Sequence, residues 1–426
     1  MSYERTREHA LNRDRADTLA SFRSRFHLPP GRTRPTAIYL AGNSLGLQPT
    51  TVRALVDEEL DDWARHGVAG HLDSRRPWLP YHEPLAQDTA LLVGARPDEV
   101  VNMNTLTVNL HLMMVSFFRP TPERPCILIE AGAFPSDRYA VASQLAYYGL
   151  NVRDALLEVS PRPGEHCIRA EDLYALLERE GHQIALVLLP GVQYRTGQAF
   201  DLARITKIAR AQGCRVGFDL AHSIGNLPHA LHDWGPDFAC WCSYKFLNAG
   251  PGAIGGCFVH ERHAHAAGLP RFAGWWGHDK ATRFLMGPNF KALPGAEGWQ
   301  ISNPPILSMA PLIASLALFR EAGMQRLREK SIALTGFLEF LLENRLSNVI
   351  EIVSPHHPAE RGCQLSLRLR AGVGRGKAVF DEISRHDVVC DWREPDVIRA
   401  APVPLYNSFE DVWDFVEILG AALATR

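Results

Sequence analysis

Between residues 90 and 260, short apolar runs alternate with longer runs of mixed polarity. The run C-I-L-I-E at 126–130 has the length of a strand, and I-A-L-V-L-L at 184–189 is apolar at every position. Continuous apolar runs of this length are typical of parallel strands that are covered on both faces. After them, V-G-F-D at 216–219 predicts a further strand of the same sheet.

The segments between these strands have apolar residues at helical spacing. Residues 136–149 predict one helix that closes at a glycine, and 201–212 predict another, with Gly213 just beyond its end. Strands and helices therefore alternate along this part of the chain. This alternation predicts an α/β domain with a mostly parallel central sheet flanked by helices.

The last third of the chain follows a different pattern. Helical spacing over 305–345 predicts a long helix broken at Gly323, and C-Q-L-S-L-R-L-R at 363–370 alternates as a strand does. A final helix begins at Ser408, where Asp411 completes a capping box. We further predict strands at 348–353, 388–391 and 397–400, a helix over 376–386, and a buried face of the final helix made by Val412, Phe415, Val416, Leu419 and Leu423.

This change of pattern predicts two domains. Residues 37–303 would form the large domain, and residues 304–426, joined by residues 1–36, would form a smaller α/β domain. A chain of 426 residues, 46% of them hydrophobic, is long enough to give each domain its own core.

Charge and hydropathy exclude several classes of partner. The net charge is −2, so we expect no nucleic-acid partner and no membrane-surface partner. The N-terminal segment M-S-Y-E-R-T-R-E-H-A lacks the apolar core of a signal peptide, and no apolar run has the length of a membrane-spanning helix. Eight cysteines are scattered along the chain, several within apolar runs, which favours reduced thiols in a cytoplasmic protein.

Lys245 and Asp219 are the first candidates for chemistry. Asp219 ends the strand in V-G-F-D-L-A-H, and Lys245 follows it by 26 positions in C-W-C-S-Y-K-F-L-N-A-G. A lysine that forms a Schiff base, together with a carboxylate that keeps a ring nitrogen protonated, is what pyridoxal 5′-phosphate requires. Taken alone, the pair is equally compatible with a surface lysine and a carboxylate that caps a helix.

Two further segments could supply a phosphate cradle and a stacking ring. Leu106 and Thr107 lie where a loop turns into a helix, and a helix N-terminus with a hydroxyl binds phosphate well. The segment A-F-P-S-D at 133–137 follows a strand, so that Phe134 could lie on the ring while Ser136 and Asp137 make polar contacts. In isolation, the first segment is an ordinary capped helix and the second is a turn.

Taken together and in order, the motifs of this chain resemble the kynureninase family, homodimeric fold-type-I pyridoxal phosphate enzymes of the aminotransferase class V group. The resemblance covers nearly the whole chain and runs through L-A-G-N-S-L-G-L-Q-P (40–49), G-H-L-D-S-R-R-P-W (70–78), N-T-L-T-V-N-L-H (104–111), A-F-P-S-D, D-L-A-H, C-W-C-S-Y-K-F-L-N-A-G, G-W-W-G-H (274–278), Q-I-S-N-P-P-I-L (300–307), R-G-C-Q-L (361–365) and I-R-A-A-P-V-P-L-Y-N (398–407).

The resemblance implies a role for each matching position. Lys245 would carry the cofactor, Asp219 would pair with its ring nitrogen, Phe134 would stack on the ring, and Tyr244 would touch the phosphate. Because Tyr244 is adjacent to Lys245, we also expect it to donate and relay protons. Arg399 would clamp the substrate carboxylate, as a planar bidentate donor does well. The other implied cofactor contacts are Leu106, Thr107, Pro135, Ser136, Asp137 and His222, with Trp275 and Asn303 reaching across a homodimer interface. His71, Ser302 and Asn303 would lie near the substrate's aromatic end.

The implied reaction is the hydrolytic cleavage of the Cβ–Cγ bond of L-kynurenine, and of 3-hydroxykynurenine, to anthranilate or 3-hydroxyanthranilate and L-alanine. It would serve tryptophan catabolism or NAD biosynthesis. One position departs from the family: Pro190 stands in L-L-P-G-V-Q-Y-R-T-G-Q where the family often has serine. Proline has neither a hydroxyl nor an N–H, so a cofactor contact from this position is not expected.

Three motifs invite other interpretations. G-P-G-A-I-G at 250–255 matches a dinucleotide-binding pattern, but a strand is expected after it where that pattern needs a helix. H-E-R-H-A-H at 260–265 lacks the histidine spacing of a zinc protease, so we interpret it as a solvated helix start. Cys240 and Cys242 alternate on one strand as small core residues, and no metal site is expected.

Two alternative functions remain open at this point. The same scaffold serves cysteine desulfurases and class V aminotransferases, and a desulfurase would need a reactive cysteine, for which Cys363 is the only candidate by region. A pyridoxal phosphate-binding regulator would need an added DNA-binding domain, and too few residues precede the first strand to form one.

Overall fold

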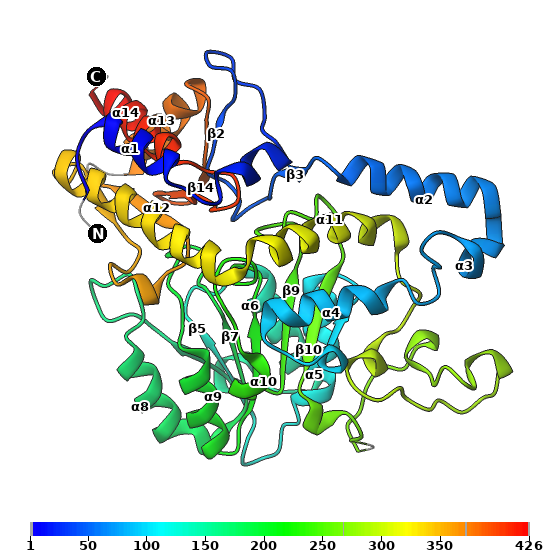
Figure 1. The fold of residues 1–426 in the computed structure, drawn as a ribbon. Helices are drawn as coiled ribbons and strands as arrows, with labels where there is room; N and C mark the ends of the chain where they lie inside the picture. The colour runs from blue at the N-terminus through cyan, green and yellow to red at the C-terminus, as the bar shows by residue number, and fades with distance from the viewer. Residues whose placement is uncertain (1–2, 267, 371–372, 425–426) are drawn as a thin grey trace.

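The computed structural model describes residues 3–266, 268–370 and 373–424. Its centre is a seven-stranded sheet in the order β4-β10-β9-β8-β7-β5-β6 (Figure 1). Strands β9, β8, β7, β5 and β6 are parallel, whereas β10 pairs antiparallel with both β9 and β4. The strand bounds are β4 Val100–Asn102, β5 Cys126–Glu130, β6 Leu156–Val159, β7 Ile184–Pro190, β8 Arg215–Asp219, β9 Phe238–Cys242 and β10 Gly255–Val259.

Helices cover both faces of this sheet, which explains why its strands are apolar throughout. On one face, Ile127 and Ile129 of β5 pack against α5 (Leu106–Phe117) and α6 (Pro135–Tyr147). The other face packs Leu128 with α8 (Ala170–Glu180) and α9 (Leu202–Ala211). The predicted strands and helices of this region are confirmed to within two residues at each end, and Gly213 has the positive φ of 80° expected beyond α9.

A second, four-stranded antiparallel sheet has the order β11-β12-β15-β14. Its strands are β11 Ile350–Ile352, β12 Leu365–Leu369, β14 Asp391–Arg393 and β15 Val397–Ala400. The helices α12 (Met324–Arg345), α13 (Val373–Arg385), α14 (Phe409–Ala424) and α1 (Arg7–Arg15) bury a separate core against it. The short strand β2 (Ile38–Tyr39) runs parallel to β13 (Val388–Val389) beside this core.

The predicted helix break and helix cap in the C-terminal third are both confirmed. The long helix breaks at Gly323, whose φ is 77°, into α11 (Ile306–Ala322) and α12, which are bent by 81°. Ser408 caps α14 as predicted, because Asp411 N donates to Ser408 Oγ (3.0 Å) and Ser408 N donates to Asp411 Oδ2 (3.2 Å). The five predicted core residues of α14 are all buried.

The N-terminal part adds α2 (Val52–His66), the short α3 (Gly70–Asp73) and α4 (His82–Val93). In Figure 1, α2 and the segment around residues 270–290 both extend toward the same side of the molecule. The remaining short elements are η1 Ala20–Arg25, β1 Phe26–His27, β3 Gln48–Pro49, η2 Gly67–Ala69, η3 Pro97–Glu99, α7 Val152–Ala155, η4 Gly181–Gln183, α10 Leu231–Trp234, η5 Glu261–His263, η6 Trp275–Gly277, η7 Arg283–Leu285, η8 Ala296–Trp299 and η9 Pro358–Glu360.

No single helix among the described residues is long and apolar enough to cross a membrane. Within the described part of the chain, one pair of helices, α11 and α12, reaches that length and composition, and the pair is bent by 81°.

Candidate active site

A cavity of about 230 Å³ opens at the carboxyl ends of four neighbouring strands, β9, β8, β7 and β5. This edge is where ligands bind in open α/β sheets. Asp219 ends β8, Pro190 ends β7 and Glu130 ends β5, while Lys245 follows β9 by three residues. The cavity is lined by Thr105, Leu106, Thr107, Glu130, Phe134, Ser136, Asp137, Pro190, Val192, Tyr194, Asp219, His222, Tyr244 and Lys245.

Lys245 and His222 face each other in this cavity. The Lys245 Nζ lies 3.0 Å from His222 Nε2, although 23 residues separate them in the chain. Burial, followed by the charges of Lys245 and Arg399, holds the pKa of His222 well below its usual value. His222 is therefore neutral near pH 7 and can accept a hydrogen bond from the lysine amine.

Three carboxyl groups share the cavity with this single amine. Asp219 is 8% exposed, and its Oδ1 accepts a hydrogen bond of 2.7 Å from the backbone N–H of Ala221. Burial, then the charge of Asp219, raises the pKa of Asp137 well above its usual value. Burial also raises the pKa of Glu130, to about 8, with smaller contributions from Asp219 and Glu158. Buried like charges cannot all ionise together, so part of this cluster is protonated at neutral pH.

The N-terminus of α5 provides donors at one end of the cavity. Thr107 Oγ1 and Ser136 Oγ lie 2.7 Å apart, so the hydroxyls at the starts of α5 and α6 converge. Asn104, just before the helix, has a positive φ of 49° and its carbonyl accepts from Gly255 N (2.7 Å). The first N–H groups of a helix have no partner within it, so this corner suits a phosphate.

Two aromatic rings lie near the amine. The Lys245 Nζ lies 5.9 Å from the centre of the Phe134 ring and 5.8 Å from that of Tyr244. Phe134 also contacts Tyr194 edge to face, with ring centres 5.2 Å apart. Burial, then the neighbouring Cys242, raises the pKa of Tyr244 above its usual value. The Tyr244 hydroxyl therefore keeps its proton at neutral pH and can donate it.

The substrate-clamp candidate, Arg399, is completely buried beside the cavity but is not among its lining residues. Its Nε donates to Asp391 Oδ1 (3.0 Å) and its Nη1 donates to the Tyr194 carbonyl (2.7 Å). Its Nη2 lies 2.7 Å from Asp391 Oδ1 as an ion pair but lacks the geometry of a hydrogen bond. This guanidinium is oriented by its neighbours and still has unused N–H donors.

Five other predicted residues lie outside the cavity lining. Trp275 is 43% exposed, with its Nε1 donating to the Arg283 carbonyl (3.1 Å), and Ser302 and Asn303 are exposed as well. His71 lies in α3 against Trp78, and its buried Nδ1 has no hydrogen-bond partner among the described residues. Pro135 is the first residue of α6, a position where proline is favoured, and it does not line the cavity itself.

Sequence reasoning missed four lining residues. Thr105, Val192 and Tyr194 line the cavity, and Tyr194 belongs to the loop after β7. Glu130 is the only charged residue in C-I-L-I-E and ends its strand as Asp219 does, so a carboxylate at a strand end was a usable signal. Pro190 lies opposite Asp219 on the neighbouring strand and offers the cavity no donor.

The three motifs with alternative interpretations are resolved by their surroundings. Gly250 and Gly252 have positive φ in a turn that leads into β10, so the dinucleotide interpretation is excluded as predicted. Cys240 and Cys242 are buried in β9, also as predicted. The prediction of a solvated segment at 260–265 is wrong at His263, which is 5% exposed: it packs on the ring of Phe117, and Asp237, just before β9, accepts a 2.8 Å hydrogen bond from it.

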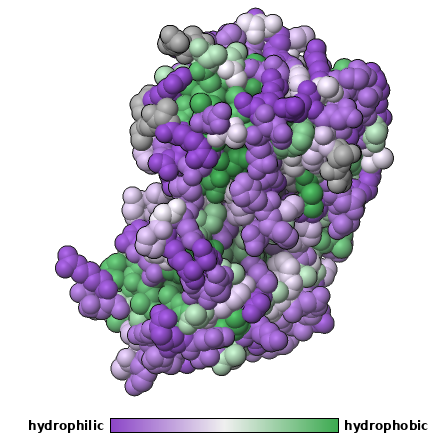
Figure 2. Space-filling model, turned by 90° about the vertical axis from the view of Figure 1, so that its left-hand side faces the viewer, coloured by the Kyte–Doolittle hydropathy of each residue, from purple (hydrophilic) through white to green (hydrophobic). Residues whose placement is uncertain are grey.

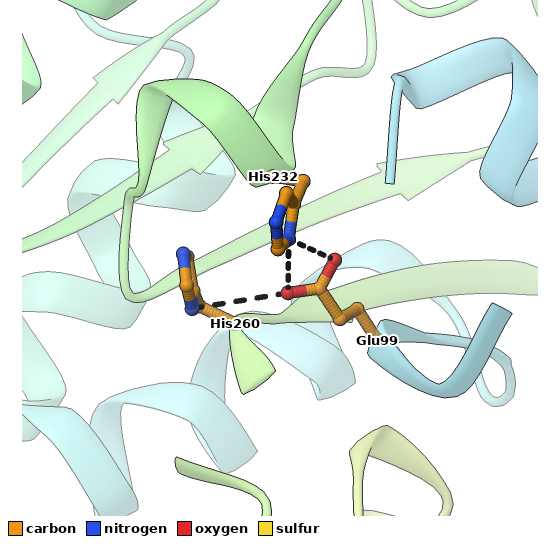
Figure 3. A group of neighbouring side chains, drawn as sticks. All are labelled: Glu99, His232 and His260. Carbon is orange, nitrogen blue, oxygen red and sulfur yellow. Dashed lines mark hydrogen bonds and ion pairs between the residues drawn. The ribbon is translucent and has the colours of Figure 1, made fainter. Parts of the chain in front are cut away.

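Three groups of histidine and glutamate lie close enough to hold a metal ion, among the residues that the structure describes. In the most buried of them, His232 Nδ1 lies 3.1 Å from both carboxylate oxygens of Glu99, and His260 Nδ1 lies 3.8 Å from Oε1 (Figure 3). Glu99 also accepts from the backbone N–H groups of Arg96 (2.9 Å) and Glu261 (2.8 Å). These hydrogen bonds account for the arrangement without a metal.

Comparison with known proteins gives matches along almost the whole chain. The profile of class-V aminotransferases matches residues 38–370, and that of the kynureninase C-terminal domain matches residues 327–419. The kynureninase of Myxococcus xanthus (strain DK1622) is 59% identical over 417 residues, which cover 98% of this chain and 97% of that protein. The kynureninase of Koribacter versatilis (strain Ellin345) is 56% identical over 416 residues, with coverage of 98% and 97%.

Solved structures of lower identity share the fold. The cysteine desulfurase CsdA of Escherichia coli has a TM-score of 0.76 at 16% identity and covers 95% of this chain and 98% of its own. A C-DES mutant with glycine covalently linked to its pyridoxal phosphate cofactor has a TM-score of 0.75 at 18% identity, with coverage of 90% and 96%. At these identities the likeness is one of fold, and it confirms the fold-type-I architecture.

Proposed function

Because this chain belongs to the kynureninase family, we propose that it hydrolyses the Cβ–Cγ bond of L-kynurenine, and of 3-hydroxykynurenine, to anthranilate or 3-hydroxyanthranilate and L-alanine. The single observation that carries this proposal is the 59% identity to a kynureninase over 98% of the chain. The cavity beside Lys245 supplies the chemical groups that the reaction needs.

The cavity fits pyridoxal phosphate, the cofactor of this family. Two residues that line it, Asp137 and His222, each have a buried polar atom (Oδ1 and Nδ1) without a hydrogen-bond partner among the described residues. Buried polar atoms without partners are rare, and here both belong to residues that line a cavity large enough for a polar ligand. Lys245 would hold the cofactor through its amine, Asp219 would keep the ring nitrogen protonated, and Leu106, Thr107 and Ser136 would receive the phosphate.

When bound, pyridoxal phosphate supplies an electron sink conjugated to the substrate's α-carbon. Lys245 would remove the α-proton and later return one, and His222 would orient its amine, which lies 3.0 Å away. Tyr244, which keeps its hydroxyl proton, donates to the oxygen of the γ-ketone. Arg399 turns its unused N–H donors to the substrate carboxylate, with Asp391 fixing the guanidinium plane.

The overall reaction consumes one water. Water adds to the γ-ketone, the Cβ–Cγ bond breaks, and its electron pair remains with Cβ. Anthranilate then leaves with both oxygens, and protonation of Cβ completes L-alanine. The atoms of kynurenine and water equal those of the two products.

A second copy of the chain would complete the site. Trp275, Ser302 and Asn303 are exposed and lie outside the cavity of their own chain. Exposed apolar side chains gather on the same two segments that extend from the body in Figure 1, namely Leu60, Trp63, Val68, Leu72, Phe272, Phe284, Leu285, Met286 and Phe290. On the face in Figure 2, by contrast, polar residues predominate and apolar ones form separate areas. These features support a homodimer.

All eight cysteines are unpaired, and seven of them are buried, which supports a reducing compartment such as the cytoplasm.

The function is tested by mixing the pyridoxal phosphate-loaded protein with kynurenine and recording anthranilate fluorescence. Anthranilate and alanine should form in equal amounts. Transamination alone, or sulfide release from cysteine without anthranilate, would refute the proposal.

The dimer is tested by mixing two inactive variants, Lys245→Ala and Asn303→Ala. If Asn303 serves the partner's site, half of the reassorted dimers contain one intact site, so activity should recover to about a quarter of the wild type. No recovery despite subunit exchange would contradict the shared site.

A further inference from the structure

Glu130 is a buried acid that the proposed reaction does not use. It ends β5, is 4% exposed and lines the cavity that holds Lys245. Its side chain makes no hydrogen bond or ion pair with the side chain of another described residue. An ionised carboxylate in such a place loses its hydration with little compensation, which strongly favours the neutral acid.

The sheet order places Glu130 near a second carboxyl. Strand β7 lies between β5 and β8, so Glu130 and Asp219 end strands that are two places apart, with about 10 Å between their backbones from the usual strand spacing. Pro190 ends the strand between them and has neither a hydroxyl nor an N–H that could satisfy either acid. Asp137, from the first turn of α6, is the third acid and has its own Oδ1 unpaired.

The elements around Glu130 bring mainly acidic side chains toward it. Glu158 lies on β6, Asp219 ends β8 and Asp137 lies on α6, so the surroundings are acidic. Arg138 is engaged by Glu158 at 2.5 Å. Lys245 is the only cationic residue among those that line the cavity, and His222 is neutral. One amine cannot balance three buried carboxylates.

The hydrogen bonds indicate which acid keeps its charge. Asp219 accepts a backbone N–H from Ala221 at 2.7 Å, and such a bond stabilises the ionised form. At Glu130, burial outweighs the hydrogen bond from its own backbone N–H and raises its pKa to about 8. The negative charge is thus retained at Asp219, where it can face a protonated ring nitrogen.

We propose that Glu130 is a positioning residue that keeps its proton at neutral pH and thereby leaves Asp219 as the charged acid beside the cofactor ring. This inference rests on the proposed cofactor site. It gives the end of strand β5 a defined electrostatic role, because a protonated Glu130 forms a polar but uncharged wall of the cavity.

The test uses infrared spectroscopy of the apoprotein, which reports the carbonyl band of protonated carboxylic acids. The wild type should show this band at pH 6.5 and lose part of it with a midpoint near pH 8. The lost part should be absent from Glu130→Gln and present in Glu158→Gln, a matched control on the adjacent strand. An identical pH-dependent band in wild type and Glu130→Gln would overturn the proposal.

A second measurement does not depend on folding of the variant. In wild-type protein carrying carboxyl-¹³C-labelled glutamate, the band that titrates near pH 8 should shift to lower frequency. A titrating band that the label leaves in place belongs to another residue type and overturns the assignment.

The effect on the cofactor gives a readout that a merely structural role would not change. The dissociation constant of pyridoxal phosphate, measured from pH 6.5 to 9.5, should rise more steeply above pH 8 in the wild type than in Glu130→Gln, because only the wild type gains a negative charge there. At pH 7 the two constants should agree within about threefold, because glutamine reproduces the neutral acid. Failure of the proposed function would appear separately, as wild-type protein that forms no anthranilate.

Discussion

Two groups of acids and histidines beside the seven-stranded sheet differ in how their polar atoms are satisfied. At the carboxyl ends of β5 to β9, Asp137 Oδ1 and His222 Nδ1 have no partner among the described residues. Beside the antiparallel edge, Glu99 accepts from two backbone N–H groups and from His232 (Figure 3). The first group is built around a space for a ligand, whereas the second joins η3, α10 and η5 together.

This difference teaches how to separate a site from a structural cluster. Both groups contain residue types that bind ligands, and the second has the spacing of a metal site. A ligand site leaves polar atoms unpaired until the ligand arrives, and a structural cluster pairs them within the protein. Mutations should therefore affect activity in one place and stability in the other.

The largest effect is expected from Asp219→Asn. The amide cannot keep a ring nitrogen protonated, so kcat should fall by roughly 10³-fold or more. Thermal unfolding of the apoprotein should be unchanged or occur at higher temperature, because a buried charge near two other acids is removed. The rate is measured by anthranilate fluorescence and the stability by calorimetry. If Asp219→Asn lost stability as well as activity, the two groups would not differ in the way that the account requires.

Glu99→Gln should show the reverse behaviour. Its side-chain amide brings an N–H group against backbone donors, and breaking a buried pair costs about 3 kcal/mol of unfolding free energy. Urea unfolding measures this loss. Turnover per folded molecule should stay at the wild-type value, and a large fall in kcat would mean that the cluster belongs to the active site.

Acid should weaken the second group through His260. Burial, then the charge of Arg262, lowers the pKa of His260 from 6.5 to about 4, while Glu99 opposes the shift. Because the folded pKa lies below the unfolded one, the unfolded state binds the proton more tightly. Stability from this residue is present above pH 6.5 and is lost as pH falls toward 4, by about 1 kcal/mol at pH 5 once solvent screening of this partly exposed ring is allowed for. In His260→Gln the unfolding free energy should change less over this range, and an equal slope would contradict the assignment.

The smallest effect is expected from Cys363→Ser. Cys363 is 1% exposed, and burial raises its pKa to about 12, so it cannot serve as the reactive thiolate of a desulfurase. Anthranilate formation should stay within about twofold of the wild type, as for a small buried residue outside the cavity. Abolished turnover together with sulfide release by the wild type would favour the desulfurase alternative.

Elements with strong local signals could be predicted from the sequence. The apolar run of β5, the glycine break between α11 and α12, and the capping box at Ser408 each depend on neighbours a few residues away. The cavity residues Lys245, Asp219, His222 and Phe134 were also found, because they follow strands in recognisable motifs.

The remaining features depend on contacts between distant segments. Strand order in the sheet is not strand order in the chain, so nothing local places Glu130 on the cavity with Asp219. Arg399 is oriented by Asp391, on the neighbouring strand, and by the carbonyl of Tyr194, which lies 205 residues earlier in the chain. His263 is buried where it contacts Asp237, 26 residues earlier, and the ring of Phe117, which is still farther away in the chain. The extent of the two domains and the roles of Trp275, Ser302, Asn303 and His71 remain predictions.

The central claim is that the unpaired polar atoms around Lys245 form the cofactor site. The direct test is to load the protein with pyridoxal phosphate, reduce it with borohydride and map the modified peptide by mass spectrometry. A yellow protein with one phosphopyridoxyl group per chain, fixed on Lys245, is the predicted result. A colourless protein, or a label on another lysine with Lys245 unmodified, would contradict the account.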